Sequence, residues 1–457
     1  MANQKKGNGG LIALICVMAV ILVALIIVAV GMNGGGDITP TQTDPVITTE
    51  PTTEPTTEAT TEPTTEPPII KEATATVGAV GDILMHDALI QGGYDKATNT
   101  YNYDYLFKWL GPAIGQVDFA VANLEVTLGS NEKRNYGGYP LFNCPDTIVD
   151  ALQNANFDLL LTANNHSYDT GAFGFARTQQ VLKEKGIPHI GSRPTLEDKS
   201  YYIADINGIK VGMINYTYNT SIYADGSVAL NGIKLSKEDS ALINTFGYNK
   251  LDDFYAQLEQ QLKDMQADGA EASVVYIHWG NEYQTKENNY QNQIAQALCD
   301  LGVDVIVGNH AHVPQPVELL TSQKDETQKT LCLYSTGNCV SNIYQTSKFP
   351  VNTEDGMIFT FTFAKYSDGT VVVESTRVIP TWVYRYSDAN YVRKHLVMVM
   401  DDTVEDWKTA MELTDAQLKS CQNSYDRTMK IVGEGVDQAN EYYKANQEKV
   451  EAELGVE

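Results

Sequence analysis

The sequence predicts a mixed α/β fold, and two patterns in the chain support this expectation. Short runs rich in leucine and β-branched residues alternate with segments of helical periodicity, which is typical of sheets covered by helices. Two further pairs of apolar runs are joined through Asn207-Gly208 and Asp368-Gly369, and such dipeptides supply the backbone conformations that tight hairpins need. The fold should therefore combine buried strands with antiparallel hairpins.

The predicted elements follow from these patterns in order. Five apolar runs are expected to be strands: 74–80, 119–124, 157–162, 274–278 and 303–307. Residues 172–185, which end before Gly186, and residues 251–266 have helical periodicity. The two hairpins are expected to pair 201–206 with 210–216 and 357–364 with 371–378.

The composition excludes several classes of protein. Of 457 residues, 43% are hydrophobic and 20% are charged, which is ordinary for a globular chain and too apolar for a wholly disordered one. The net charge of −26 argues against a nucleic-acid partner, because such proteins need basic patches that displace counterions. It also argues against attachment to anionic lipid by charge alone.

The N-terminus carries a predicted membrane anchor. Leu11 to Val30 is an unbroken run of 20 apolar residues, which as a helix would span about 30 Å, the thickness of the hydrocarbon core of a bilayer. Lys5 and Lys6 precede it without any acidic residue, so the N-terminus should be cytoplasmic and the remainder extracellular. A cleaved signal peptide is the alternative, but its apolar core is usually shorter.

A low-complexity segment follows, with Pro-Thr-Thr-Glu units at 51–54, 55–58 and 63–66. Proline and like-charge repulsion should keep it extended, with a reach of about 100 Å. The chain is therefore divided into five predicted segments: a cytoplasmic N-terminus (1–10), a transmembrane anchor (11–31), a disordered stalk (32–70), a folded domain (71–385) and a helical C-terminal extension (386–457). That extension should either pack on the domain or mediate assembly.

Polar residues gather at the ends of the five predicted strands. The five turns are Gly81-Asp82, Asn123-Leu124-Glu125, Asn164-Asn165-His166 with Asp169 beyond it, the segment 278–282, and the segment 308–312. Since the carboxyl ends of strands in an open α/β sheet form the ligand crevice, these side chains are expected to share one edge.

The residue types at this edge indicate a metal centre. Any one of them would more often be a helix cap or a packing residue. His310 and His312 are stronger together, since alternate residues of an extended segment point the same way. Carboxylate, amide and imidazole ligands suit manganese, iron or zinc better than calcium. Two such ions bridged by a carboxylate would clamp an oxyanion and activate water.

The ordered motifs resemble those of the CapA family of poly-γ-glutamate capsule synthesis proteins. The set consists of Gly-Asp, Asn-Leu-Glu, Asn-Asn-His-x-x-Asp, His-Trp-Gly-x-Glu, Gly-x-His-x-His and Ser-x-Gly-Asn, and it covers residues 73–384. The resemblance implies a calcineurin-like metallophosphoesterase fold, which is a four-layer α/β sandwich with a dinuclear metal centre.

The resemblance also implies roles for individual residues. Asp82 and His312 would bind the first metal ion, and Glu125 would bridge the two ions. The second ion would be held by three residues: Asn165, His278 and His310. His166, backed by Asp169, would protonate a leaving group.

Two departures from the phosphoesterase pattern affect the first metal position. Those enzymes have histidine two residues after the first aspartate, whereas this chain has Leu84 there and its nearest histidine is His86. They bridge with aspartate, whereas this chain has the longer Glu125. The sequence is therefore compatible with a centre that holds one divalent ion as well as with a centre that holds two.

The sequence as a whole predicts a membrane-anchored, outward-facing, metal-dependent hydrolase or transferase that acts on a cell-envelope polymer or its precursor. Membrane subunits of capsule synthesis are expected partners, and nucleic acid is not. The alternatives are a polymer-binding or scaffold subunit with a degenerate metal site, and a general extracellular phosphatase.

Overall fold

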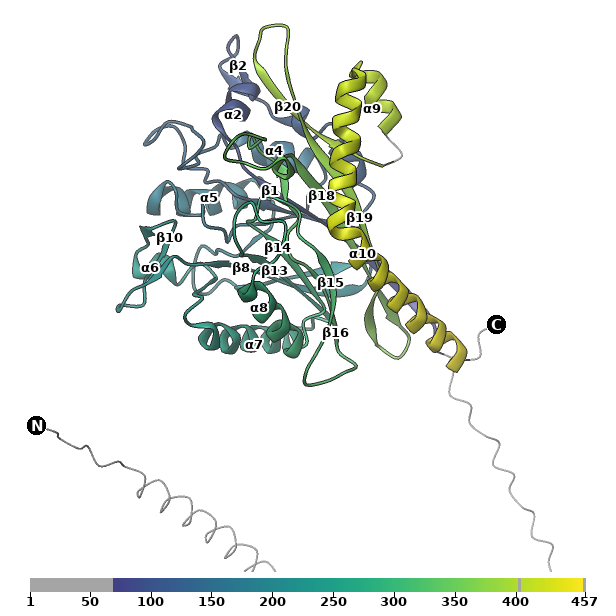
Figure 1. The fold of residues 1–457 in the computed structure, drawn as a ribbon. Helices are drawn as coiled ribbons and strands as arrows, with labels where there is room; N and C mark the ends of the chain where they lie inside the picture. Colours follow the sequence, from purple (N-terminus) through teal and green to yellow (C-terminus); the bar gives the residue numbers. More distant parts are fainter. Residues whose placement is uncertain (1–68, 402–403, 455–457) are drawn as a thin grey trace, which may run out of the picture. The chain divides into compact units, whose positions relative to one another are not determined.

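Two β-sheets form the centre of the computed structural model, which describes residues 69–401 and 404–454 (Figure 1). The first sheet has eight strands, of which β1, β4, β5 and β6 run parallel and β18, β19 and β20 are antiparallel. In sheet order its strands are β20 (Arg393–Val399), β19 (Val371–Ser387), β18 (Asp355–Tyr366), β1 (Lys71–Ile83), β4 (Phe119–Leu124), β5 (Leu159–Leu161) and β6 (His189–Ile190), with β17 (Asn338–Val340) beside β1.

The second sheet has seven strands and is mostly parallel. In sheet order its strands are β12 (Thr245–Phe246), β8 (Ile209–Tyr218), β13 (Ala272–His278), β14 (Val305–Asn309), β16 (Lys329–Leu333) and β15 (Val317–Thr321), with β7 (Tyr202–Ile206) beside β8. All five predicted strands are present, as β1, β4, β5, β13 and β14. Both predicted hairpins are also confirmed, as β7–β8 and β18–β19.

Helices cover the outer face of each sheet, so the described chain has the layer order helix, sheet, sheet, helix. One apolar core lies between the first sheet and α2 (Asp87–Gly93), α3 (Leu110–Ile114), α4 (Thr147–Asn154) and α5 (Gly171–Lys185). A second core fills the space between the two sheets. A third lies between the second sheet and α7 (Leu251–Ala267) and α8 (Asn289–Asp300). The mixed α/β fold expected from the sequence is therefore confirmed.

The expectation that residues 386–457 are a helical extension is wrong in its first part. β19 continues to Ser387, and β20 pairs with it antiparallel, so a boundary at 385 would cut through the first sheet. Charged and half-exposed residues begin β20, which conceals its strand character in the sequence. Helices begin only afterwards, with α9 (Val404–Ala410) and α10 (Asp415–Leu454).

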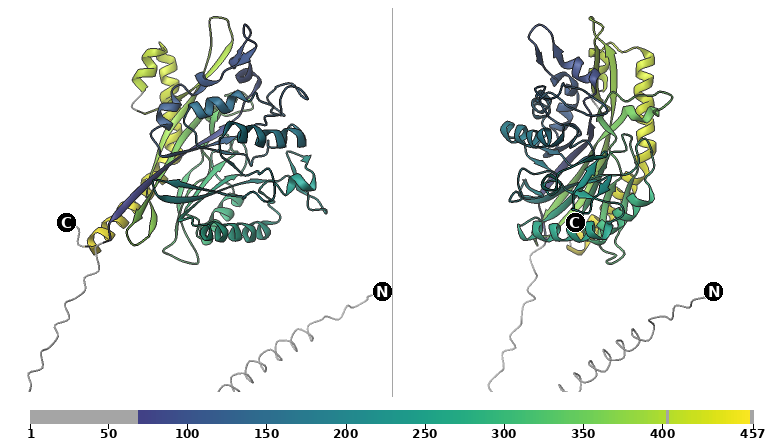
Figure 2. Two further views of the ribbon diagram at one scale, coloured as in Figure 1. Left: turned by 180° about the vertical axis from the view of Figure 1, so that it is seen from behind. Right: turned by 90° about the vertical axis from the view of Figure 1, so that its left-hand side faces the viewer.

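The long helix α10 packs on the domain and completes its core. In Figures 1 and 2 it runs alongside β18 and β19 as the yellow helix. Val432, Val436 and Ala439 are buried in the core between the sheets. Arg427 forms hydrogen bonds to both carboxylate oxygens of the buried Asp355. The packing alternative for the C-terminal helices is therefore the one observed.

The predicted N-terminal segments lie almost wholly outside the described part of the chain. Only Ile69 and Ile70 of the expected stalk belong to it, and the expected anchor, residues 11–31, does not. None of the helices within 69–401 and 404–454 combines the length and apolar character that crossing a membrane requires.

Candidate metal centre

The two sheets meet at one edge, where the carboxyl ends of their strands deliver the predicted polar residues. Asp82 near the end of β1 lies in register with Asn123 of β4 and Asn338 of β17. His278 at the end of β13 lies in register with Asn309 of β14. Gly81 permits this convergence, because a Cβ atom there would lie 1.8 Å from the carbonyl oxygen of Gly337.

Five of the six predicted metal ligands form two overlapping groups. One group consists of Asp82, Glu125 and His312, and the other consists of Glu125, His278 and His310. In each group the potential ligand atoms all lie within 4.8 Å of one another. Glu125 is common to both groups, which is the position that a bridging carboxylate would occupy.

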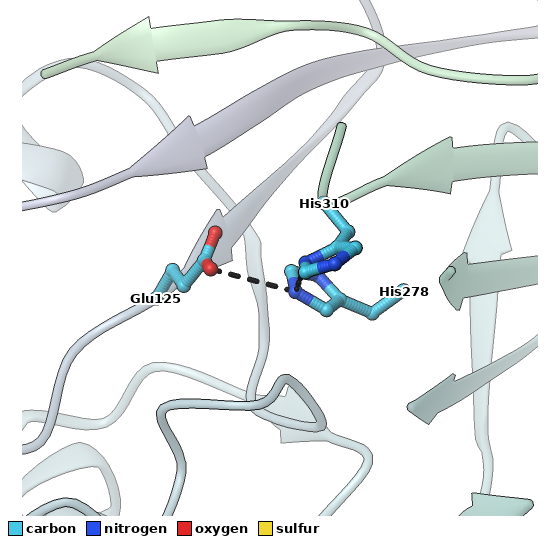
Figure 3. Close-up of side chains that lie close together, drawn as sticks. All are labelled: Glu125, His278 and His310. Atoms are coloured by element: carbon cyan, nitrogen blue, oxygen red, sulfur yellow. Dashed lines mark hydrogen bonds and ion pairs between the residues drawn. The ribbon is translucent and has the colours of Figure 1, made fainter. Parts of the chain in front are cut away.

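The side chains in these groups are in direct contact. His312 Nδ1 lies 2.9 Å from Asp82 Oδ2, and His310 Nδ1 lies 3.1 Å from His278 Nε2. Figure 3 shows Glu125 facing the two imidazoles of His278 and His310, with its Oε1 3.4 Å from His278 Nε2. The sixth predicted ligand, Asn165, places its Oδ1 2.7 Å from His278 Nε2. The structure thus brings all six residues together.

The electrostatics of the cluster fit a divalent cation. Glu125 is fully buried, and within the described residues its Oε1 accepts no hydrogen bond. Burial and the neighbouring Asp82 carboxylate raise the pKa of Glu125 well above its ordinary value. Two adjacent carboxylates in a buried site repel each other when both are ionised. A bound metal ion would offset the free-energy cost of this repulsion and of the burial of charge.

The pKa values of His278 and His310 suit metal binding. Burial lowers the pKa of His278 to about 3, and burial together with the neighbouring imidazoles lowers the pKa of His310 well below its ordinary value. Both rings are therefore neutral and can offer a lone pair to a metal ion. For His312, burial alone would lower the pKa, but the hydrogen bond with Asp82 raises it overall.

His310 and His312 reach the centre by a different backbone path from the one expected. The residues do not lie on an extended segment, since β14 ends at Asn309 and both histidines have positive φ angles, of 93° and 56°. Such conformations cost about 1–3 kcal/mol each in a non-glycine residue and are concentrated at functional sites. The bend places the rings with centroids 5.8 Å apart. The shared direction was predicted correctly, but its cause is the bend.

The turn after β5 separates three adjacent polar residues. Asn164 holds the turn in place, with its Nδ2 donating to the carbonyl oxygen of Leu124 at 2.9 Å. Asn165 turns towards His278, whereas His166 Nδ1 lies 2.7 Å from Asp169 Oδ2. Asp169 Oδ2 also accepts a hydrogen bond from the backbone N–H of Phe142. His166 is thereby oriented by a buried carboxylate, as the sequence predicted.

The position occupied by histidine in phosphoesterases is taken here by Leu84, which is buried in the first core. His86 does not replace that histidine. It stands immediately before α2, and its Nδ1 accepts a hydrogen bond from the backbone N–H of Asn342 at 3.3 Å. Among the described residues His86 belongs to none of the three candidate metal-binding groups.

Several residues that lie in the centre were assigned no individual role from the sequence. Asn123 donates from Nδ2 to Asp82 Oδ1 at 2.7 Å, and Asn338 Oδ1 lies 3.2 Å from His312 Nδ1. Glu282 forms a third candidate group with His310 and His312, on the exposed side of the cluster. These three residues stand within the recognised motifs, which could have revealed them. Asn231 contacts both Asn165 and His166, and no motif marks it.

Comparisons with known proteins agree with these motifs. The model of a family described as "Bacterial capsule synthesis protein PGA_cap" matches residues 76–343. The capsule biosynthesis protein CapA of Bacillus anthracis is 28% identical over 270 residues, which are 58% of this chain and 59% of that protein. The PGA biosynthesis protein CapA of Bacillus subtilis (strain 168) is 30% identical over 268 residues, which are 57% of this chain and 62% of that protein.

The matched regions therefore span about three fifths of the length of these curated relatives. Among solved structures, the crystal structure of TT1561 of Thermus thermophilus is 8% identical. The match covers 63% of this chain and 94% of that one. Its TM-score of 0.32 is too low to indicate a shared fold.

Proposed function

Since this chain belongs to the bacterial capsule synthesis protein family PGA_cap, we propose that it is a metal-dependent hydrolase or transferase of capsule or cell-envelope polymer synthesis, with a fold of the metallophosphoesterase type. Poly-γ-glutamate or its precursor is the polymer that the family suggests. The proposal covers the reaction class and leaves the bond that is cleaved or formed to experiment.

One observation carries this proposal: two groups of metal-ligand side chains overlap in a buried carboxylate, Glu125. Asp82, Glu125 and His312 would hold one ion, and Glu125, His278, His310 and Asn165 a second. A divalent ion of manganese, iron or zinc would supply Lewis-acid polarisation and lower the pKa of bound water. The protein's own side chains would fix its position and exclude bulk solvent.

The contact between His166 and Asp169 favours an enzyme over a polymer-binding or scaffold subunit. A metal site that only stabilises the fold needs no imidazole oriented by a separate carboxylate. Here Asp169 Oδ2 lies 2.7 Å from His166 Nδ1. Since a carboxylate accepts and does not donate, this contact assigns the Nδ1 hydrogen to that bond and leaves Nε2 for proton transfer with a substrate.

The charge of the protein restricts how it would hold a polyanion. With a net charge of −26, the protein repels poly-γ-glutamate at long range. Attraction must therefore come from the centre itself and from cations beside it. Arg134 lies beside Asp169, the residue that orients the proposed acid, with its Nη1 3.3 Å from the carbonyl oxygen of Asp169. Arg177 is less suited, because it is held by the Asp146 carboxylate through two hydrogen bonds.

The test begins with metal analysis of the purified domain, residues 69–457. The metal-loaded protein is then assayed on p-nitrophenyl phosphate, bis(p-nitrophenyl) phosphate and a γ-glutamyl amide oligomer. We expect the domain to bind divalent metal stoichiometrically and to turn over at least one of these substrates. A chelator should abolish that turnover. Bound metal without turnover on any substrate class would favour the scaffold alternative. Rapid, unselective hydrolysis of simple phosphomonoesters would favour the general phosphatase.

We also propose that the protein is anchored in the cell membrane through Leu11–Val30, with the folded domain outside. Protease added to intact cells is expected to remove the domain beyond the stalk, because the flanking lysines keep only the N-terminus inside. Immunoblotting with antibodies against the domain measures this, and a cytoplasmic enzyme serves as the control for lysis. A domain that is degraded only after the cells are permeabilised would contradict the orientation.

A further inference from the structure

A small hairpin contacts the turn that carries Asn165 and His166. β10 (Val228–Leu230) and β11 (Ile233–Lys234) pair antiparallel, and a two-residue turn of Asn231 and Gly232 joins them. The φ angles of these two residues, 46° and 76°, are those of a left-handed tight turn. The hairpin therefore presents the side chain of Asn231 from a rigid turn.

The hairpin is fixed to the same segment that carries Asn165 and His166. Val228 and Leu230 pack with Ala163, Tyr168 and Phe175 in a separate apolar cluster. The Tyr168 hydroxyl also donates a hydrogen bond at 2.6 Å to Asp239 Oδ2, in the short helix α6 (Lys237–Ser240) that follows the hairpin. The turn after β5 and the hairpin thus form one packed unit, although about 65 residues of sequence separate them.

Asn231 contacts the two neighbouring residues to which different roles are assigned. Asn165 Nδ2 donates to Asn231 Oδ1 at 3.1 Å, and Asn231 Nδ2 lies 3.4 Å from His166 Nδ1. Because the His166 Nδ1 hydrogen is committed to Asp169, the Asn231 amide group has no acceptor in that ring nitrogen. The stabilising hydrogen bond of Asn231 in this turn is therefore the one with Asn165.

That contact determines which atom Asn165 presents to the centre. A side-chain amide has one oxygen and one NH2 group, and only the oxygen can bind a cation. Asn165 Oδ1 faces His278 Nε2 at 2.7 Å, while its Nδ2 faces Asn231. If the Asn165 amide rotated by 180°, its NH2 group would point at the proposed ion, and its oxygen would face the Asn231 Oδ1 atom, which is also an acceptor.

We propose that Asn231 is a positioning residue of the centre, which holds the Asn165 amide with its oxygen towards the metal. This inference rests on the proposed function, because it takes Asn165 as a ligand. Outer-shell partners of metal ligands typically contribute about 10–100-fold to metal affinity. The same range is expected for Asn231.

The chain supplies a matched pair of variants for the test. Asn231→Gly removes the amide and keeps a residue that adopts positive φ readily. Asn207→Gly makes the same change in the β7–β8 turn, where Asn207 has a φ of 54° and donates to the carbonyl oxygen of Thr74 at 3.0 Å. Asn231→Asp keeps an acceptor for Asn165. Mn²⁺ affinity is measured by calorimetry for these three variants, for Asn165→Ala and for the unaltered protein, with thermal melting to verify folding.

We expect Asn231→Gly to weaken Mn²⁺ binding by about 10-fold or more, Asn207→Gly to leave it within about twofold, and Asn231→Asp to restore it. Unchanged affinity in Asn231→Gly, in a protein where Asn165→Ala weakens binding, would overturn the positioning role alone. If the unaltered protein binds Zn²⁺ or Fe²⁺ and not Mn²⁺, the same comparison is made with that ion. Failure to bind any of the three would overturn the proposed function and this inference with it. If Asn231→Gly lowers the melting temperature more than Asn207→Gly does, a loss of folding could account for weak metal binding, and the Asn231→Asp variant then serves as the test. Weak Mn²⁺ binding by a well-folded Asn231→Asp variant would overturn the positioning role.

Discussion

Replacement of His310 with alanine is expected to reduce metal affinity by more than about 100-fold, beyond the loss caused by removing an outer-shell partner. His310 belongs to two of the three candidate groups, and its ring is neutral and buried. The change removes one nitrogen ligand from the group that also contains Glu125 and His278. His278→Ala should act in the same direction through the same group. The measurement is metal stoichiometry by plasma emission spectroscopy after dialysis, together with calorimetric titration of Mn²⁺ and Zn²⁺.

His86→Ala is the matched control for this prediction. It also removes a histidine with a low pKa, which burial sets at about 4, close to the centre. The residue belongs to no candidate metal-binding group among those formed by the described residues. The His86→Ala variant should therefore bind metal as the unaltered protein does. Unchanged metal content in both His278→Ala and His310→Ala would mean that these rings are packing residues. Loss of metal in His86→Ala would show that it takes the place of the absent histidine.

His166→Ala is expected to lower turnover by about 10²–10⁴-fold, the usual contribution of general acid–base catalysis. Metal content and the melting temperature should stay close to those of the unaltered protein. Within the described residues, the hydrogen-bond partners of the His166 ring are Asp169 and Asn231, and neither belongs to a candidate metal-binding group. Initial rates on the active substrate, measured beside metal stoichiometry, check this expectation.

Two neighbouring variants test the separation of roles in this turn. Asn165→Ala should lower metal affinity and turnover together, since its Oδ1 faces His278. Asp169→Asn should reproduce a milder loss than His166→Ala, because it can still accept the Phe142 N–H and yet orients the imidazole less well. Asp169→Ala is a poorer choice, since it would also release that backbone group. Full activity in His166→Ala would exclude the acid role and favour the binding-subunit alternative.

The sequence by itself determined the strands that build the centre. The runs that became β1, β4, β5, β13 and β14 are short, apolar and followed by polar turns, and these are local properties that survive in any tertiary context. Asn207-Gly208 likewise fixed the β7–β8 hairpin, because the positive φ angles of its turn are a preference of the two residues themselves. The order of the motifs identified which polar residues would meet.

Only the tertiary structure decided how those residues meet. Pairing with the preceding strand β19 placed β20 in the first sheet, although β20 begins with polar residues. The approach of His310 and His312 depends on a strained bend, and nothing in a His-Ala-His sequence requires one. Asn231 reaches Asn165 because an Asn-Gly turn in a separate hairpin packs against the turn after β5. Local patterns record what each segment prefers, whereas the contacts between distant segments depend on the path of the whole chain.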